Sequence, residues 1–212
     1  MSARYPVMLD VSRLSVLVVG GGQVALRKVR GLVEAGARPE IVAPEVHPEL
    51  LEVIHEHGLD WHRRPYLPGD GFETHLVFAA TDSRRVNEQA GRLAAEDGAL
   101  VDVVDDPRHS HVHVPAVIRQ DEVVVAFSTG GASPLLARRL RERLEPVVTA
   151  GLGRAARRLA ALRAEVRARW PEDGARRRAA WFGLVTPEFL DAAIAGRDDE
   201  VEHRISRCLS QS

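Results

Sequence analysis

Residues 14–25 constrain the fold most strongly, because they join an apolar run, a glycine turn and the start of a helical pattern. The apolar run at 14–19 leads into Gly20-x-Gly22-x-x-Ala25. Strand, glycine turn and helix in this order form the layout that binds dinucleotides. We expect Gly20 to take the tight turn, Gly22 to admit a pyrophosphate, and Ala25 to let the helix pack closely on the strand. The N-terminus of that helix offers N–H groups and partial positive charge to phosphates.

Apolar runs and helical patterns alternate along residues 1–113. Strands are predicted at 14–19, 39–43, 76–80 and 100–104, and residues 59–63 are expected to be extended. Helical patterns lie between them at 23–35, which Gly36 closes, 47–57 and 83–96. This alternation predicts an α/β fold with a Rossmann-like, doubly wound parallel sheet. Ligands of such sheets bind at the carboxyl ends of the strands, which are followed here by the loops 20–23, 43–47, 80–83 and 105–113.

The pattern changes at Pro115. Residues 122–128 predict a further strand, which leads through a double-glycine turn into a helix at 135–144. From residue 147 onward only helical patterns follow, with breaks at 170–174 and at 186–188, where Thr186 is a candidate N-cap followed by Pro187. We therefore expect a Rossmann domain at 1–113, a small α+β segment at 114–147 and a helical domain at 148–212.

Composition excludes several classes of protein. The single cysteine, Cys208, permits no internal disulfide, which is typical of proteins in the reducing cytoplasm. We expect Cys208 itself to be a spectator thiol. No apolar stretch approaches the roughly 20 residues that span a bilayer, and the first residues lack the apolar core of a signal peptide. We therefore expect a cytoplasmic protein with no membrane partner.

The net charge of −1 conceals an uneven distribution of charge. Residues 138–178 hold 13 arginines and five acidic residues, which gives this stretch +8 and the remainder −9. Guanidinium groups suit bidentate contacts with carboxylates and phosphates, so the stretch can face an acidic partner. The alternative is a set of solvated helix faces. An isoelectric point near 6.8 and only 5% aromatic residues argue against a nucleic-acid partner.

The residue that follows the second strand usually decides between NAD and NADP. An acidic side chain there binds the ribose 2′-hydroxyl of NAD, whereas a basic one accommodates a 2′-phosphate. Glu45 stands just beyond the usual place, and no lysine or arginine is near it. The sequence therefore favours NAD as the cofactor.

Five segments resemble one family in order along the chain. They are Tyr5–Asp10, Val18–Lys28, Ala79–Asp82 with Asn87, Val103–Pro107 and Ser128–Arg139. Together they resemble the siroheme synthase N-terminal family, whose members are precorrin-2 dehydrogenases, some of them also sirohydrochlorin ferrochelatases. The resemblance covers residues 5–145, and the chain resembles a stand-alone form without a methyltransferase domain.

The resemblance implies that the chain oxidises precorrin-2 to sirohydrochlorin with NAD⁺ and works as a homodimer through the segment at 114–147. Asp105 matches the family's main catalytic aspartate, and Thr129, beside Ser128, matches a family hydroxyl. Cofactor contacts are expected along the glycine loop and after the second and third strands, at Gly20, Gly22, Gln23, Val24, Pro44, Glu45, Thr81 and Asp82.

The residues themselves agree with this chemistry. Oxidation of a reduced tetrapyrrole removes a hydride and a proton, and a carboxylate at the end of a strand can accept that proton or orient the macrocycle. Asp105 and Asp106 are adjacent, so mutual repulsion is expected to raise the pKa of one of them. The alternative for Asp106 is that it opens a turn with Pro107. Arg138 and Arg139 are the candidates for binding substrate carboxylates, and the pattern does not separate their roles.

The chain departs from the family at two places. Asp102 stands where the family usually has Asn, and His109, His111 and His113 replace apolar or aromatic residues. Alternating histidines place their rings on one side of an extended segment and can bind a transition metal such as the Fe²⁺ or Co²⁺ that a chelatase inserts. The alternative is that they are ordinary polar residues of a loop, and no resident metal is assigned.

Two further classes of function stay open. A non-catalytic NAD-sensing regulatory module would explain the glycine loop but not Val103–Pro107 or Ser128–Arg139. A nucleic-acid-binding protein would explain only the arginine-rich helices. The sequence does not decide whether metal insertion accompanies dehydrogenation.

Overall fold

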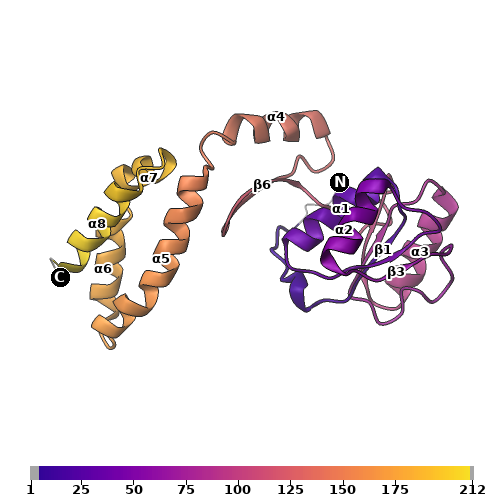
Figure 1. The fold of residues 1–212 in the computed structure, drawn as a ribbon, viewed down its shortest axis with the longest axis horizontal. Coiled ribbons are helices and arrows are strands. Elements are labelled where there is room, and N and C mark those ends of the chain that lie inside the picture. Colours follow the sequence, from indigo (N-terminus) through magenta and orange to yellow (C-terminus); the bar gives the residue numbers. More distant parts are fainter. Residues whose placement is uncertain (1–4, 211–212) are drawn as a thin grey trace. The chain divides into compact units, whose positions relative to one another are not determined.

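The computed structural model describes residues 5–210, and these form two compact units, Tyr5–Val114 and residues 115–210 (Figure 1). The boundary lies one residue beyond the one expected from the sequence. The further boundary between residues 147 and 148 stays a prediction.

The first unit is built on a five-stranded, all-parallel sheet with the order β3-β2-β1-β4-β5. Its strands are β1 (Val16–Val19), β2 (Glu40–Val42), β3 (Trp61–His62), β4 (Leu76–Ala79) and β5 (Leu100–Val103). A short 3₁₀ helix, η1 (Val11–Arg13), precedes them, and the α-helices are α1 (Gln23–Glu34), α2 (Pro48–His57) and α3 (Arg84–Glu96). The Rossmann-like doubly wound fold predicted from the sequence is therefore confirmed.

Helices cover both faces of this sheet (Figure 1). Successive residues of a strand point to opposite faces, and in β1 all four residues are buried. Val16 and Val18 pack in the cluster formed with α1 and α2, whereas Leu17 and Val19 pack in the cluster formed with α3. Burial on both faces explains why this strand is a continuous apolar run rather than an alternating one.

The strand order changes direction at β1. The chain runs outward through β2 and β3 and then returns to place β4 on the other side of β1. Because all pairings are parallel, the carboxyl ends of β1, β2, β4 and β5 lie at one edge of the sheet. This is the topological switch point at which such sheets bind their ligands.

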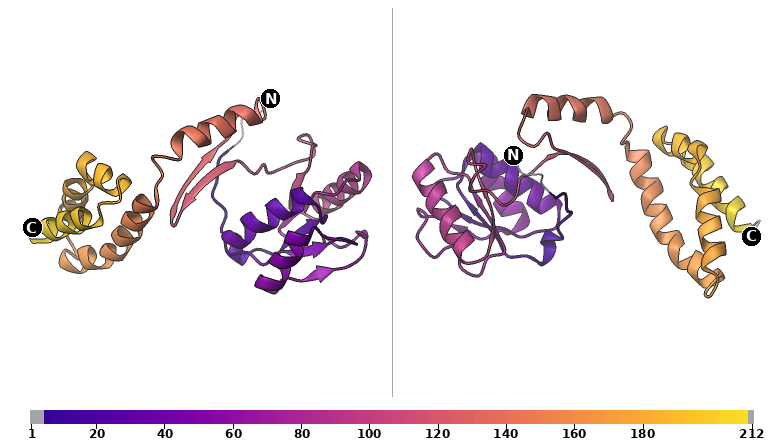
Figure 2. Two further views of the ribbon diagram at one scale, coloured as in Figure 1. Left: turned by 45° about the horizontal axis from the view of Figure 1, so that its top comes forward. Right: turned by 180° about the vertical axis from the view of Figure 1, so that it is seen from behind.

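The second unit contains an antiparallel hairpin and five helices within residues 115–210 (Figure 2). The hairpin is β6 (Ala116–Gln120) with β7 (Val123–Phe127), and the helices are α4 (Pro134–Leu144), α5 (Ala150–Arg169), α6 (Gly174–Leu184), α7 (Pro187–Ile194) and α8 (Asp198–Ser210). The sequence did not predict β6 or the break before α8, where Gly196 has φ +69°. The cap of α7 is confirmed, because the Thr186 side chain accepts a hydrogen bond from Phe189 N at 3.4 Å.

The last four helices share a core around Leu162, Trp170, Leu184, Phe189 and Ile205. Helix α4 differs from them, because it lies along the hairpin and has no buried residue (Figure 2). No helix among residues 5–210 combines the length and the hydropathy that a membrane span requires.

Candidate active site

The glycine loop after β1 is wedged between the loops that follow β2 and β4. A Cβ on Gly20, which has φ +127°, would lie 2.3 Å from Ala80 O, and one on Gly21 would lie 2.0 Å from Glu45 O. Gly20 N also donates to Val42 O at 2.9 Å. Both positions therefore exclude any side chain, Gly20 by its conformation and both by close backbone contact. The sequence predicted the tight turn at Gly20 but assigned no role to Gly21.

Gly22 is in a different situation, because nothing lies within 4 Å of the position of its Cβ. It is the N-cap of α1 and brings no side chain to the first turn of that helix. The exposed N–H groups and the helix dipole make this opening suitable for an anion. The residues present therefore fit the pyrophosphate of a dinucleotide at the place predicted from the sequence.

His47, which the sequence analysis missed, ties this loop to the start of α2. Its backbone N–H donates to Gly21 O at 2.7 Å, and its Nδ1 accepts from Glu49 N at 3.2 Å as the cap of α2. Its Nε2 lies 2.6 Å from the side-chain amide of Gln23. The predicted cofactor contact Gln23 is therefore held by a side chain from the next loop. A histidine before Pro48 was a weak signal, since Ser, Thr, Asp and Asn are the usual caps.

The other predicted cofactor contacts differ in accessibility. Pro44 and Glu45 are exposed beside the glycine loop, and Val24 is partly buried against the core. In the loop after β4, Asp82 is exposed, whereas Thr81 is held by Asn87.

Asn87 is one of two buried polar side chains of the described residues, with 5% exposure. Its Oδ1 accepts from Thr81 N at 2.9 Å and from Thr81 Oγ1 at 2.7 Å, and its Nδ2 donates to Thr81 O at 2.9 Å. Three hydrogen bonds to one residue fix the loop between β4 and α3 at the carboxyl edge of the sheet. Both the backbone and the hydroxyl of Thr81 are therefore held in place by Asn87 at this edge of the sheet.

Asp102, the second buried polar residue, forms an ion pair with Lys28 across the sheet face covered by α1. The Asp102 and Lys28 side chains are 9% and 18% exposed. Asp102 pairs in register with Phe78 of β4, and Lys28 Nζ lies 5.2 Å from the centroid of the Phe78 ring. The residue that departs from the family pattern thus joins α1 to the strand that leads into Asp105.

Asp105 and Asp106 follow β5 directly but have different surroundings. Asp105 is exposed and adopts φ +57°, whereas the Asp106 side chain is 13% exposed. Asp106 Oδ1 accepts from Arg108 N at 3.2 Å and from His109 N at 3.3 Å, and its Oδ2 lies 2.6 Å from His109 Nδ1. These hydrogen bonds, first of all that from the His109 ring, lower the pKa of Asp106. Asp106 is therefore not the member of the pair whose pKa is raised, because hydrogen bonding to the charged form favours ionisation.

The histidines of this loop do not form a metal site. Residues 109–113 are not a strand, and His111 N and Val112 N both donate to Val101 O, at 2.8 and 3.1 Å. Within residues 5–210 no three His, Cys, Asp or Glu side chains gather in a way that could hold a metal ion. His109, His111 and His113 therefore lack the common face that strand geometry would have provided.

The double-glycine turn of the second unit is closed by its own hydroxyl groups. Ser128 Oγ accepts from Gly130 N at 3.2 Å, and Thr129 Oγ1 both accepts from Ser133 N and donates to Ser133 O, at 3.1 Å each. Ser133 in turn caps α4 by accepting from Leu136 N at 3.1 Å. The two predicted hydroxyls are thus ordered by the turn.

Arg138 and Arg139 share one acidic partner. Arg138 Nε lies 3.1 Å and Arg139 Nη1 2.8 Å from Glu142, and hydrogen bonds from Arg139 and Arg138 lower the pKa of that carboxyl. The two arginine side chains are 76% and 72% exposed. Both are therefore exposed enough to contact an acidic ligand.

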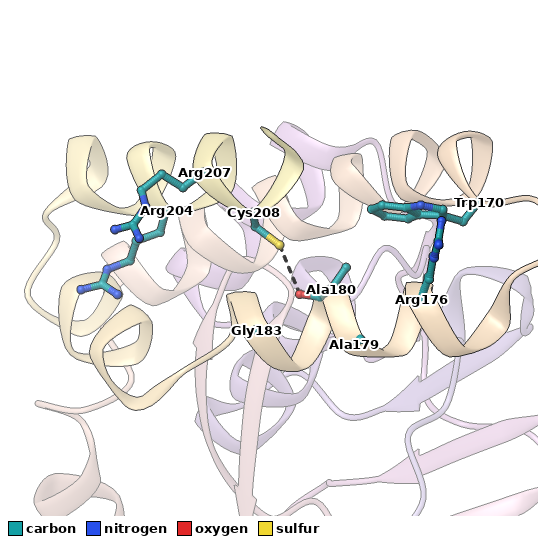
Figure 3. Close-up of a pocket in the computed structure, with 8 residues that line it drawn as sticks. All are labelled: Trp170, Arg176, Ala179, Ala180, Gly183, Arg204, Arg207 and Cys208. Atoms are coloured by element: carbon teal, nitrogen blue, oxygen red, sulfur yellow. Dashed lines mark hydrogen bonds between the residues drawn. The ribbon is translucent and has the colours of Figure 1, made fainter. Parts of the chain in front are cut away.

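A pocket of about 590 Å³ opens between α6 and α8 of the second unit (Figure 3). Trp170 and Arg176 lie at one end, Arg204 and Arg207 at the other, and Cys208 lies between them, with its thiol 3.3 Å from Ala180 O. Burial raises the pKa of Cys208, which favours the unreactive thiol expected from the sequence. None of the predicted cofactor or substrate residues lines this pocket.

Family models match both units of the chain. The model described as "Putative NAD(P)-binding" matches residues 7–116, and that described as "Sirohaem biosynthesis protein central" matches residues 125–145. Siroheme synthase of Chromobacterium violaceum is 40% identical over 208 residues, and Siroheme synthase 1 of Aeromonas salmonicida is 38% identical over 204. The chain belongs to the siroheme synthase family of NAD(P)-binding proteins.

These alignments cover 95% and 96% of the chain but only 44% and 43% of the two relatives. The chain thus spans less than half the length of the curated siroheme synthases that it matches. Among solved structures, "SirC, precorrin-2 dehydrogenase" matches with a TM-score of 0.78 and 26% identity, over 96% of this chain and 100% of that one. The family fold therefore extends through both units, and the first of them binds a nicotinamide dinucleotide.

Proposed function

We propose that this chain oxidises precorrin-2 to sirohydrochlorin with NAD⁺. The observation that carries the proposal is the pairing, at one edge of one parallel sheet, of an open helix N-terminus at Gly22 with an exposed carboxylate at Asp105. The similarity to a solved precorrin-2 dehydrogenase over the whole of that protein supports the choice of substrate.

The proposed choice of NAD rests on Glu45. Its backbone packs against Gly21, which places this residue beside the dinucleotide loop, and its side chain is exposed. A carboxylate at this place accepts hydrogen bonds from the ribose hydroxyls of NAD and repels the 2′-phosphate of NADP.

The bound nicotinamide supplies the hydride acceptor, and the chain supplies orientation and proton transfer. We assign to Asp105 a direct contact with the macrocycle, since its carboxylate is exposed immediately after β5. The resemblance adds Ser128 and Thr129 as hydroxyl contacts and Arg138 and Arg139 as partners of the substrate carboxylates. Guanidinium groups bind carboxylates in bidentate fashion, and both arginines are exposed on α4.

The proposed assembly is a homodimer formed through residues 114–147. Helix α4 has no buried residue, and its leucines stay largely exposed, with Leu135 at 63% and Leu136 at 51%. An apolar helix face of this kind is typical of an interface between subunits.

Two other functions have weaker support. The resemblance to a family that includes ferrochelatases suggests metal insertion into the product, but the loop histidines do not assemble a site for the metal. A non-catalytic NAD-sensing module would need only the glycine loop and would leave the exposed Asp105 without a role.

The test is an anaerobic absorbance assay of precorrin-2 with NAD⁺, followed by addition of Fe²⁺ or Co²⁺. We expect the wild type to form sirohydrochlorin and Asp105→Ala to lose this activity while it still binds NAD⁺. Metal insertion above the rate without enzyme would add the chelatase activity. NAD⁺ binding without turnover by the wild type would refute the enzyme and favour the sensor.

A further inference from the structure

Asp106 and His109 form a carboxylate–imidazole pair in the loop after β5. The Asp106 Oδ2 to His109 Nδ1 distance is 2.6 Å, and Asp106 Oδ1 accepts two backbone N–H groups from the same loop. The carboxylate is 13% exposed, whereas the imidazole is 66% exposed. The acid is thus held inside the turn, and the ring that it holds faces outward.

This hydrogen bond decides which nitrogen of the ring can accept a proton. An ionised carboxylate can only accept hydrogen bonds, so Nδ1 carries the proton and the neutral ring keeps its lone pair on Nε2. The lowered pKa of Asp106, caused first by the His109 hydrogen bond, keeps the carboxylate ionised at neutral pH. A negative charge at Nδ1 stabilises the imidazolium formed when Nε2 takes up a proton.

The pair belongs to the same turn as Asp105. Ser110 Oγ accepts from Val103 N at 2.9 Å and donates to Asp106 O at 2.8 Å, which folds the loop back onto the end of β5. The pair therefore lies at the carboxyl edge of the sheet, where the fold binds its ligands.

The charged groups near the pair come from two elements. Arg84, at the start of α3, is close enough for Asp106 to raise its pKa, although the hydrogen bond from Arg84 to Glu88 is the larger cause. Arg108 and Asp105 flank the pair within the loop itself. Arg84 forms its own salt bridge with Glu88, and Asp106 is the carboxylate in direct contact with the His109 ring.

We propose that His109 is a second catalytic residue, whose Nε2 accepts the proton released when precorrin-2 is oxidised. This inference rests on the proposed function. The substrate loses two hydrogens: one C–H bond breaks and its hydrogen leaves with the electron pair as hydride to the nicotinamide, and the other hydrogen leaves as a proton to Nε2. The imidazolium then releases that proton to water through its exposed face, while Asp105 keeps its contact with the macrocycle. Imidazole suits this step because it exchanges protons near neutral pH.

The test measures steady-state kcat and KM across pH for the wild type, His109→Gln, Asp106→Asn and the control His55→Gln, which changes an exposed histidine of α2 in the same unit. We expect His109→Gln to lower kcat about 100-fold at neutral pH, with KM and NAD⁺ affinity unchanged, and to remove the fall of the rate on the acidic side. Asp106→Asn should move that fall to lower pH, because an amide does not stabilise the imidazolium. Exogenous imidazole should restore turnover to His109→Gly, which a purely structural role of the ring would not allow.

Three results would decide against the assignment in distinguishable ways. A pH profile of His109→Gln identical to that of the wild type, with turnover lost only in Asp105→Ala, would move the proton to Asp105 and leave the proposed function standing. An equal loss in His55→Gln would show a general effect of the substitutions. No turnover by the wild type would refute the proposed function and the role of His109 with it.

Discussion

The ion pair between Lys28 and Asp102 offers a quantitative test of the structure. Lys28 is the single lysine of the chain, and its ammonium group meets a carboxylate that is 9% exposed, beside the ring of Phe78. Lys28→Met keeps the length and the apolar stem of the side chain but removes the charge. The Asp102 carboxylate then stays buried among apolar groups without its partner.

The expected cost follows from this burial. Removal of one partner of a buried ion pair costs about 3–5 kcal/mol, because the desolvation of the remaining charge is no longer offset. Asp102→Asn still leaves an acceptor for the ammonium group and should cost only about 1–2 kcal/mol. The double variant Lys28→Met with Asp102→Leu removes both charges and should regain most of the loss.

Urea unfolding followed by circular dichroism measures the free energies of unfolding of the wild type, Lys28→Met, Asp102→Leu and the double variant, which close a double-mutant cycle, with Asp102→Asn measured beside them. The matched control is Arg30→Met, because Arg30 lies on the same helix and pairs with Glu49, but the two side chains are 47% and 49% exposed. The control should cost less than about 1 kcal/mol. If Lys28→Met costs no more than the control, or if the double variant is no more stable than Lys28→Met, the pair does not act as the structure indicates.

Gly21→Ala would place Cβ 2.0 Å from a backbone carbonyl oxygen, so it should lower the free energy of unfolding by about 1–3 kcal/mol and weaken NAD⁺ binding. Gly22→Ala should weaken binding alone, because no atom lies within 4 Å of the position of its Cβ. Equal melting temperatures for the two variants would contradict this difference. Glu45→Ala should lower the preference for NAD⁺ over NADP⁺ in kcat/KM by at least about tenfold, since a hydrogen bond to a charged group contributes about 1.5–3 kcal/mol; an unchanged ratio would exclude the residue from cofactor selection. Leu136→Glu on α4 should convert a dimer to a monomer in light scattering, and an unchanged mass would place the interface elsewhere. The hydrogen bond from the neighbouring imidazole lowers the pKa of Asp106 in the folded protein. This hydrogen bond therefore stabilises the fold at pH values above the unfolded pKa, near 3.9, and the stabilisation is lost as the pH falls through the folded pKa. Urea unfolding should therefore show Asp106→Asn less stable than the wild type at pH 7 but not near pH 2, and a difference independent of pH would contradict the assignment.

The sequence by itself determined the succession of strands and helices in the first unit, because apolar periodicity and glycine punctuation act over a few residues. The strand predicted at 76–80 is Leu76–Ala79, and the helix predicted at 23–35 is Gln23–Glu34, followed by Gly36 with φ +84°. The open position at Gly22 was also predictable, because the second glycine of the motif is the one that lets the backbone approach a pyrophosphate. Weaker local signals failed, as at β6, which mixes apolar and polar residues over five positions.

Only the tertiary structure decided how residues far apart in the chain meet. Lys28 and Asp102 are 74 residues apart, and Gln23 and His47 are 24 apart, so no periodicity relates them. The exclusion of a side chain at Gly21 depends on the path of the next βα loop. The lowered pKa of Asp106 has the same physical origin, because the hydrogen bonds that lower it exist only once the loop has folded back onto β5.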